Sequence, residues 1–201
     1  MQIINADPSR MITLPGVGPC PRPVDIDTKV TGFKALKSLR IYEFSKGLTI
    51  AGDSEIDEVY VLPVCGAISL AITGAHALAA DLRQGGPQAL YMPPDHSYRL
   101  TAQENVLVAY ARAEAGGLVA THVTAKTGGD GAETLRFARL ELADGAVLSV
   151  PGLPERLIHV IAGAISANGQ RVVQGQTLAL GDGEVAEVAG AGAASVLLVH
   201  V

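Results

Sequence analysis

The chain carries one short pattern twice, at places far apart in the sequence. Residues 58–72 read EVYVLPVCGAISLAI, and residues 156–167 read RLIHVIAGAISA. In both segments an apolar run rich in β-branched residues leads to a glycine, and a second apolar run follows. β-Branched residues favour strands, and a glycine between two such runs is typical of a sharp bend. Each copy therefore predicts two strands joined at a bend.

Other segments match in the same order on both sides of this pattern. The matched pairs are residues 36–47 with 135–145, 88–100 with 176–188, and 105–111 with 195–201. Self-similarity over about ninety residues indicates one structural unit that occurs twice. The chain is therefore expected to form two tandem β-domains.

The remaining pattern favours an all-β protein with few or no helices. Short apolar runs recur every eight to twelve residues between Gly, Pro and Asp, which is typical of a β-sandwich or barrel. No segment keeps the 3.6-residue period of a helix. The expected units are an extended N-terminal arm (1–29), an N-terminal barrel (30–115), a linker with one possible strand (116–131) and a C-terminal barrel (132–201).

The N-terminal arm is rich in proline. Four of its residues are Pro15, Pro19, Pro21 and Pro23. Proline removes a backbone donor and fixes φ, so the segment is expected to be extended and irregular. It is expected to pack over a barrel or across a dimer, with a binding loop as the alternative.

The composition narrows the classes of partner and the cellular setting. The net charge is -5, and no run of Lys or Arg exceeds two residues, which argues against a nucleic-acid or anionic-membrane surface. Cys20 and Cys65 lie in no metal-ligand spacing, which favours a reduced, cytoplasmic setting, with one disulfide as the alternative. The N-terminus has no signal-peptide profile, and no apolar run is long enough to span a bilayer.

The strand pattern with its Gly bends and its G-D-G or P-P-D turns resembles the cupin double-stranded β-helix, a jelly-roll-like barrel. The segment from Val30 to Ala113, with the phrases VTGFKALKSLRIYEFSKGLTI and ALYMPPDHSYRLTAQENVLVAYARA, is more specifically similar to the 5-deoxyglucuronate and 5-keto-4-deoxyuronate isomerase family. The second half resembles cupins in general. The resemblance implies two cupin domains, and cupin enzymes hold Fe, Mn, Ni or Zn through two His, one Glu and a later His.

This chain departs from that ligand pattern in both halves. In the first half, residues 50–54 contain no His, Glu58 or Val59 is near the Glu position, and Tyr98 is at the last His position. The second half has Pro151, Leu153, Arg156 and Ala186 at the four ligand positions. Neutral imidazoles and a carboxylate are the usual ligands of such ions. The sequence therefore predicts no metal site and no cofactor.

Six residues are candidates for contact with a small-molecule ligand: Arg156, Tyr98, Tyr60, His96, His159 and Glu58. Arg156 would offer a cation to a carboxylate or phosphate, or lie at the rim beside Glu155 or Glu184. The two tyrosines would donate to a sugar-like ligand, or simply pack near the first pocket. His96 is expected on a solvated turn at the barrel mouth, with ligand contact or a general base as the alternative. His159 is expected at an interface between barrels or subunits.

Three functions remain open from the sequence. The first is a metal-independent bicupin that binds a small polar or anionic molecule, such as a carbohydrate acid. The second is a sugar-acid isomerase like the family it resembles, and the third is a non-catalytic regulatory or interaction module. A homodimer is expected by analogy with cupins.

Overall fold

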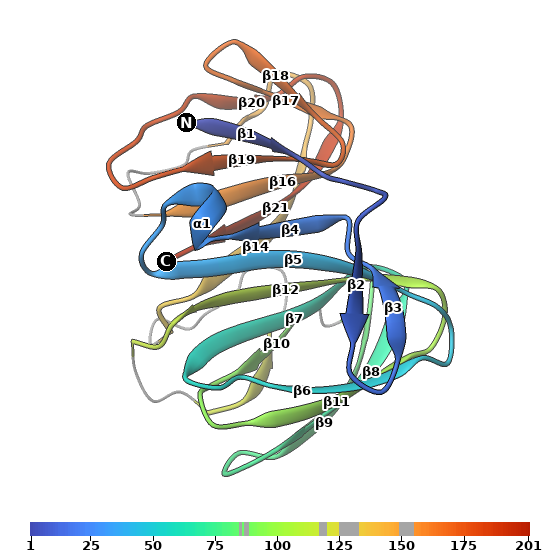
Figure 1. The fold of residues 1–201 in the computed structure, drawn as a ribbon. Coiled ribbons are helices and arrows are strands. Elements are labelled where there is room, and N and C mark those ends of the chain that lie inside the picture. Colours follow the sequence, from blue (N-terminus) through green and yellow to red (C-terminus); the bar gives the residue numbers. More distant parts are fainter. Residues whose placement is uncertain (85, 87–88, 117–119, 125–132, 149–154) are drawn as a thin grey trace.

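The computed structural model describes residues 1–84, 86, 89–116, 120–124, 133–148 and 155–201, and these lie almost entirely in strands and turns (Figure 1). The one helix in these ranges, α1 (Thr28–Thr31), has four residues, so none is long and apolar enough to cross a membrane. The N-terminal strands are β1 (Gln2–Asn5), β2 (Met11–Leu14), β3 (Gly18–Pro21) and β4 (Val24–Asp27). The first half continues with β5 (Leu36–Phe44), β6 (Thr49–Asp53), β7 (Asp57–Cys65), β8 (Ala67–Thr73), β9 (Leu78–Arg83), β10 (Ala89–Met92), β11 (Ser97–Ala102), β12 (Val106–Glu114) and β13 (His122–Thr124). The second half contains β14 (Arg136–Leu142), β15 (Val147–Leu148), β16 (Arg156–Ala162), β17 (Ala164–Ala167), β18 (Gln170–Val173), β19 (Gln176–Leu180), β20 (Val188–Gly190) and β21 (Ala194–His200).

The two halves have the same topology. In the first half, sheet I has the order β13-β10-β7-β12-β5-β4 and sheet II the order β6-β11-β8-β9. In the second half, sheet III has the order β1-β19-β16-β21-β14 and sheet IV the order β15-β20-β17-β18. Eight strands of each half therefore correspond one to one, from β5 with β14 to β12 with β21. The predicted all-β fold of two tandem domains is confirmed, although the described strands of each half form two open sheets and not a closed barrel.

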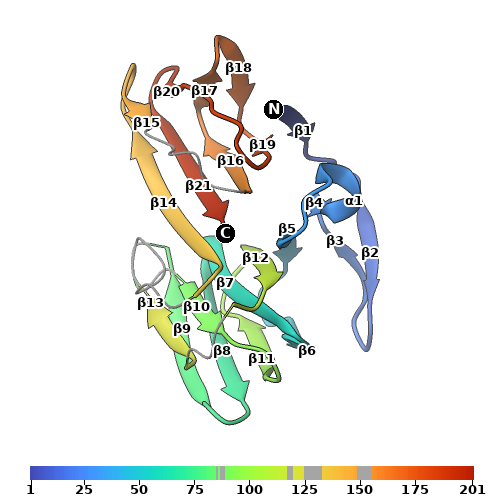
Figure 2. The same cartoon turned by 90° about the vertical axis from the view of Figure 1, so that its left-hand side faces the viewer.

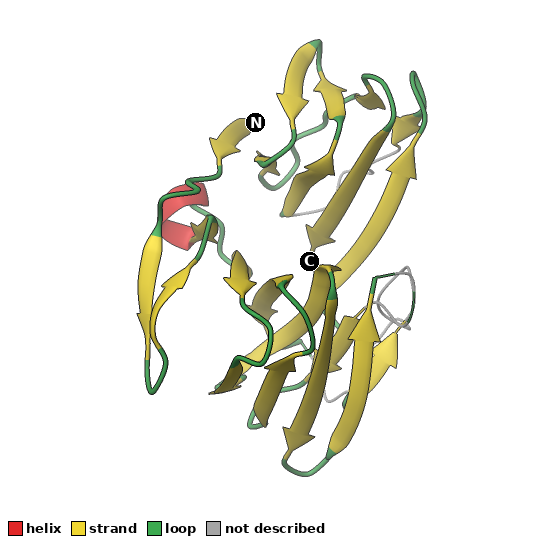
Figure 3. Ribbon diagram, turned by 90° about the vertical axis from the view of Figure 1, so that its right-hand side faces the viewer, coloured by secondary structure: helices red, strands yellow, loops and turns green. Residues whose placement is uncertain are grey.

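Three apolar clusters hold these sheets together. One lies between sheets I and II and one between sheets III and IV, so each half has its own core. The third combines residues of sheets I and III and lies between the halves, which adjoin along these sheets (Figures 2 and 3). Successive side chains of a strand point to opposite faces. In β7, accordingly, Val59 and Val61 enter the first core, whereas Tyr60 and Leu62 enter the core between the halves.

The N-terminal arm joins both halves. β1 pairs with β19 at the edge of sheet III, and β4 pairs with β5 at the edge of sheet I. Between them β2 and β3 form a separate hairpin, visible at one side of the molecule in Figure 2. The arm is extended as expected but not irregular, because Pro19 and Pro21 lie in β3, which pairs on one side only and so tolerates missing donors.

The bend glycines of the sequence repeat have the same geometry in both halves. Gly66 joins β7 to β8 with φ of 78°, and Gly163 joins β16 to β17 with φ of 74°. A Cβ at Gly66 would lie 2.8 Å from the carbonyl oxygen of Asn105, and one at Gly163 would lie 2.1 Å from that of Ala193. Glycine is thus required at both bends for its backbone conformation and for the close approach of another backbone segment.

Candidate functional site

The residues at the cupin ligand positions have other roles. Glu58, the second residue of β7, is fully buried. Its Oε1 accepts hydrogen bonds from the backbone N–H groups of Gly116 (3.0 Å) and Thr134 (3.3 Å), and its Oε2 from that of Leu135 (2.8 Å). Both carboxylate oxygens are therefore engaged by the backbone that leads into β14, in the other half.

Glu155 makes the reciprocal contact. Its Oε1 accepts a hydrogen bond from the backbone N–H of Lys34, and its Oε2 from those of Ala35 (2.9 Å) and Leu36 (2.7 Å), where β5 begins. Each half thus supplies one buried carboxylate to the backbone before the first strand of the other half. We call Glu58 and Glu155 with their N–H partners the reciprocal clamps. Sequence reasoning missed this role, although each glutamate stands eight positions before its bend glycine, Gly66 or Gly163.

Tyr60 lies between the two halves, on the face of β7 opposite the first core. Its ring centroid is 5.3 Å from that of Tyr91 and 4.9 Å from that of Phe137. Burial is the main cause that raises the pKa of the Tyr60 phenol, and the charge of Glu133 raises it further. The phenol is fully buried in a packed aromatic cluster and does not line a pocket of the first half.

Tyr98 does face the interior of the first half. It is the cross-strand neighbour of Gly52, and its hydroxyl would lie 2.5 Å from a Cβ at that glycine. Its ring centroid lies 5.9 Å from that of Tyr110, and burial raises the pKa of Tyr98 to about 12. A neutral phenol that covers a glycine is a packing element and a poor ligand for a divalent ion.

His96 is buried, with 4% of its surface exposed, so the expectation of a solvated turn histidine is wrong. Its Nδ1 lies 2.7 Å from the carbonyl oxygen of Pro94, and its Nε2 lies 3.1 Å from the backbone nitrogen of His76. Since a carbonyl only accepts and a backbone N–H only donates, Nδ1 carries the proton and Nε2 accepts. Both ring nitrogens are therefore engaged, one by the turn before β11 and one by the loop between β8 and β9.

Arg156 points into the second half and is fully buried. Its Nη2 donates to the carbonyl oxygen of Glu184. Burial lowers its pKa, and the nearby Glu184 charge opposes that effect. The guanidinium is thus held by the loop after β19, and a cation at a motif position does not fit a metal site.

His159 lies on the opposite face of β16, toward the first half. Its Nδ1 is 2.9 Å from Oγ1 of Thr177, and 5% of the residue is exposed. Burial lowers the pKa of His159 to about 4, so the ring is neutral at neutral pH. It borders a cavity between the halves together with Cys65.

His159 should make the stability of the protein depend on pH. The pKa is about 4 in the folded chain and 6.5 for the ordinary side chain, so the unfolded chain binds a proton more readily between these values. The contribution is complete above pH 6.5 and is lost as the pH falls toward 4, by about 3 kcal/mol in total. Urea titrations at pH 7 and pH 4 should show this loss in the native protein and a smaller one in His159→Leu. Equal losses in both proteins would contradict the assignment.

Over the described ranges, no three or more His, Cys, Asp and Glu side chains come together as possible metal ligands. Among the described residues, the core clusters inside both halves consist mainly of apolar side chains. At the motif positions Glu58 has a carboxylate that is already hydrogen-bonded, Tyr98 has a phenol and Arg156 has a cation. These residues do not fit the divalent ion that the resemblance implies.

Two adjoining cavities lie along the outer face of sheet II and share Ser69 and Asp81. One has a volume of about 280 Å³ and the other of about 440 Å³. Their polar or charged lining residues are Lys46, Ser69, Asp81, Arg83, Arg99, Thr101, Gln103 and Glu104. We call this continuous surface the sheet II groove. Sequence reasoning singled out none of these residues.

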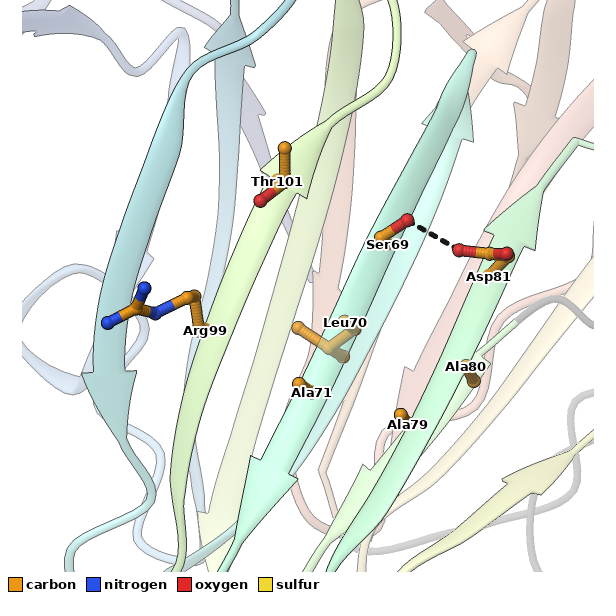
Figure 4. A pocket seen from close by; sticks show the side chains of 8 residues that line it. All are labelled: Ser69, Leu70, Ala71, Ala79, Ala80, Asp81, Arg99 and Thr101. Atoms are coloured by element: carbon orange, nitrogen blue, oxygen red, sulfur yellow. Dashed lines mark hydrogen bonds between the residues drawn. The ribbon is translucent and has the colours of Figure 1, made fainter.

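The centre of the groove is a chain of hydrogen bonds that joins β8, β9 and the turn after β11. Gln103 Nε2 donates to Ser69 Oγ (2.6 Å), which in turn donates to Oδ1 of Asp81. Figure 4 shows the Ser69–Asp81 pair beside the small side chains of Ala71 and Ala79, with Arg99 on the other side of β8. Short side chains in the middle and longer polar ones around them produce the hollow.

Comparison with known proteins places the chain in a family. A model of the KduI/IolB family matches residues 22–134, which is more than half of the chain. The chain belongs to the KduI/IolB family. No curated protein sequence matches it.

Solved structures show the fold of this KduI/IolB family member at low sequence identity. The pirin YhhW of Escherichia coli, in complex with nickel(II), has a TM-score of 0.71 and 13% identity over 100% of this chain and 99% of that chain. An IolB-like protein of Salmonella typhimurium has a TM-score of 0.66 and 14% identity, over 94% of this chain and 90% of that chain. Oxalate decarboxylase of Bacillus subtilis has a TM-score of 0.75 and 8% identity, over 100% of this chain and 77% of that chain. The predicted bicupin fold is confirmed, with a family match centred on the first half.

Proposed function

We propose that this KduI/IolB family member binds a small polar anion, such as a carbohydrate acid, in the sheet II groove and without a metal ion. The observation that carries the proposal is the set of cations and hydrogen-bonding groups along this groove. Lys46, Arg83 and Arg99 line it, against the two acids Asp81 and Glu104. An excess of positive charge favours a carboxylate ligand.

The neutral polar groups suit the rest of such a ligand. Ser69, Thr101 and Gln103 can each donate and accept, and Asp81 can accept from a sugar hydroxyl. Ser69, Asp81 and Gln103 already hold each other through hydrogen bonds. A network that is positioned before binding loses less side-chain entropy on binding.

The expected result of the direct test is saturable binding of glucuronate or galacturonate, with weaker binding of glucose. Arg99→Ala should weaken uronate binding by about tenfold, since a hydrogen bond to a charged group contributes about 1.5 kcal/mol. Isothermal titration calorimetry measures both. The matched control is Arg171→Ala, which removes an exposed arginine from β18 in the other half. Equal affinity for glucose and uronates, or equal losses in both variants, would contradict the proposal.

The second candidate is a metal-dependent sugar-acid isomerase, which family membership favours. Elemental analysis of the purified protein separates the two functions. The metal-independent proposal expects less than about a tenth of an equivalent of Fe, Mn, Ni or Zn per chain. A stoichiometric metal ion, together with isomerase activity that disappears when a chelator removes the ion, would establish the isomerase instead.

The mainly apolar core clusters inside both halves favour the third candidate, a non-catalytic interaction module. Absence of uronate binding together with absence of metal would support it.

We further propose a homodimer and a reducing, cytoplasmic setting, the latter in line with the free thiols of Cys20 and Cys65. Light scattering after size exclusion would measure the oligomeric state.

A further inference from the structure

A third cavity lies between the two halves and has different chemistry from the sheet II groove. Its volume is about 390 Å³, and the N-terminal arm, sheet I and sheet III all contribute to it. Pro23 comes from the arm, Cys65 and Leu107 from sheet I, and His159 and Ile161 from sheet III. The volume is in the lower part of the range of about 300–1,000 Å³ that is usual for small-molecule sites.

The cavity is apolar and carries no formal charge. No Asp, Glu, Lys or Arg is among the described residues that line it, and its polar side chains are those of Cys65, His159 and Gln174. Burial keeps the imidazole of His159 neutral by lowering its pKa. A carboxylate in this space would lose its hydration without gaining a cation, so an anionic ligand is disfavoured.

His159 offers one hydrogen-bonding position to such a space. Thr177 is buried, and its Oγ1 holds Nδ1 of the ring at 2.9 Å, which fixes the orientation of the imidazole. Among the described residues, none is a hydrogen-bond partner of Nε2. Because the threonine hydroxyl can donate or accept, Nε2 can take the complementary role toward a ligand.

We propose that this cavity between the halves binds a small, neutral, mainly apolar molecule that makes one hydrogen bond with His159 Nε2. A few placed polar groups in an apolar cavity at a domain interface are typical of ligand sites. The site is separate from the sheet II groove, and it selects a neutral ligand where the groove selects an anion.

Cys65 allows a direct test, because this thiol borders the cavity while Cys20 is buried in the first core. The probes are indole, which is neutral with one N–H, and benzoate, which has similar size and a charge. Indole at millimolar concentration should slow the labelling of Cys65 by monobromobimane by at least about threefold, and benzoate should not. Unchanged labelling with indole, or equal protection by benzoate, would overturn the proposal.

Two variants test the location and the hydrogen bond. Ala6→Leu fills the cavity from the arm and should abolish protection by indole, whereas Ala143→Leu, on an exposed turn, should retain it. His159→Leu keeps the cavity apolar and should weaken indole binding by about tenfold. Protection that persists in Ala6→Leu would show that indole binds elsewhere, and full affinity in His159→Leu would rule out the hydrogen bond.

Discussion

Gly163→Ala is expected to lower the free energy of unfolding by about 2–5 kcal/mol. Alanine at a φ of 74° costs about 1–2 kcal/mol because its Cβ crowds its own carbonyl group. The new Cβ would also lie 2.1 Å from the carbonyl oxygen of Ala193, which is backbone and can yield only if the strand shifts. Moving well-packed atoms in this way costs a further 1–3 kcal/mol or so. Urea denaturation followed by circular dichroism measures the change.

Two other glycines provide matched controls. Gly66→Ala has the same backbone cost and a closest contact of 2.8 Å, so its effect should be smaller. Gly145 has a φ of 69° and nothing within 4 Å of the added Cβ, so Gly145→Ala should lose only the backbone cost of about 1–2 kcal/mol. The expected order of destabilisation is Gly163, Gly66, Gly145. If Gly163→Ala costs no more than Gly145→Ala, the close approach does not constrain the bend.

Glu155→Ala is expected to cost about 3–5 kcal/mol, because three backbone N–H groups at the start of β5 lose their acceptor in a buried place. Glu155→Gln should cost about 2 kcal/mol, since its amide group turns one acceptor into a donor that faces another donor. Glu58→Gln should behave in the same way through Gly116, Thr134 and Leu135. Chemical denaturation gives these values.

Glu187→Gln is the control, because Glu187 is exposed and should change stability by no more than about 0.5 kcal/mol. Hydrogen exchange provides a local measurement: the Leu36 amide should exchange faster in Glu155→Gln, and the Leu135 amide faster in Glu58→Gln. If the clamp variants matched Glu187→Gln in stability and exchange, the clamps would contribute nothing. The clamps and the strand β1 make each half depend on the other, so neither half is expected to fold alone.

The fold class and the tandem arrangement can be predicted from the amino-acid sequence alone. These follow from local rules: strand-forming runs of period two, turns at Gly, Pro and Asp, and glycines with positive φ at Gly66 and Gly163. Asp95, the last residue of the P-P-D turn, has a φ of 61°, a backbone conformation that Asp tolerates in turns. The departure from the cupin ligand pattern at Tyr98 and Arg156 is also evident from the sequence.

The roles of the candidate residues, in contrast, depend on contacts that form only in the folded chain. The sequence predicts ligand contact for Glu58 and a rim position beside Arg156 for Glu155, but both carboxylates accept hydrogen bonds from backbone N–H groups more than 50 positions away in the chain. His96 was placed on a solvated turn, yet Pro94 and His76 engage its ring and the turn buries it. The sheet II groove and the cavity between the halves are assembled from strands that adjoin only after folding. Backbone conformation depends on neighbours in sequence, whereas burial, hydrogen-bond partners and cavities depend on neighbours in space.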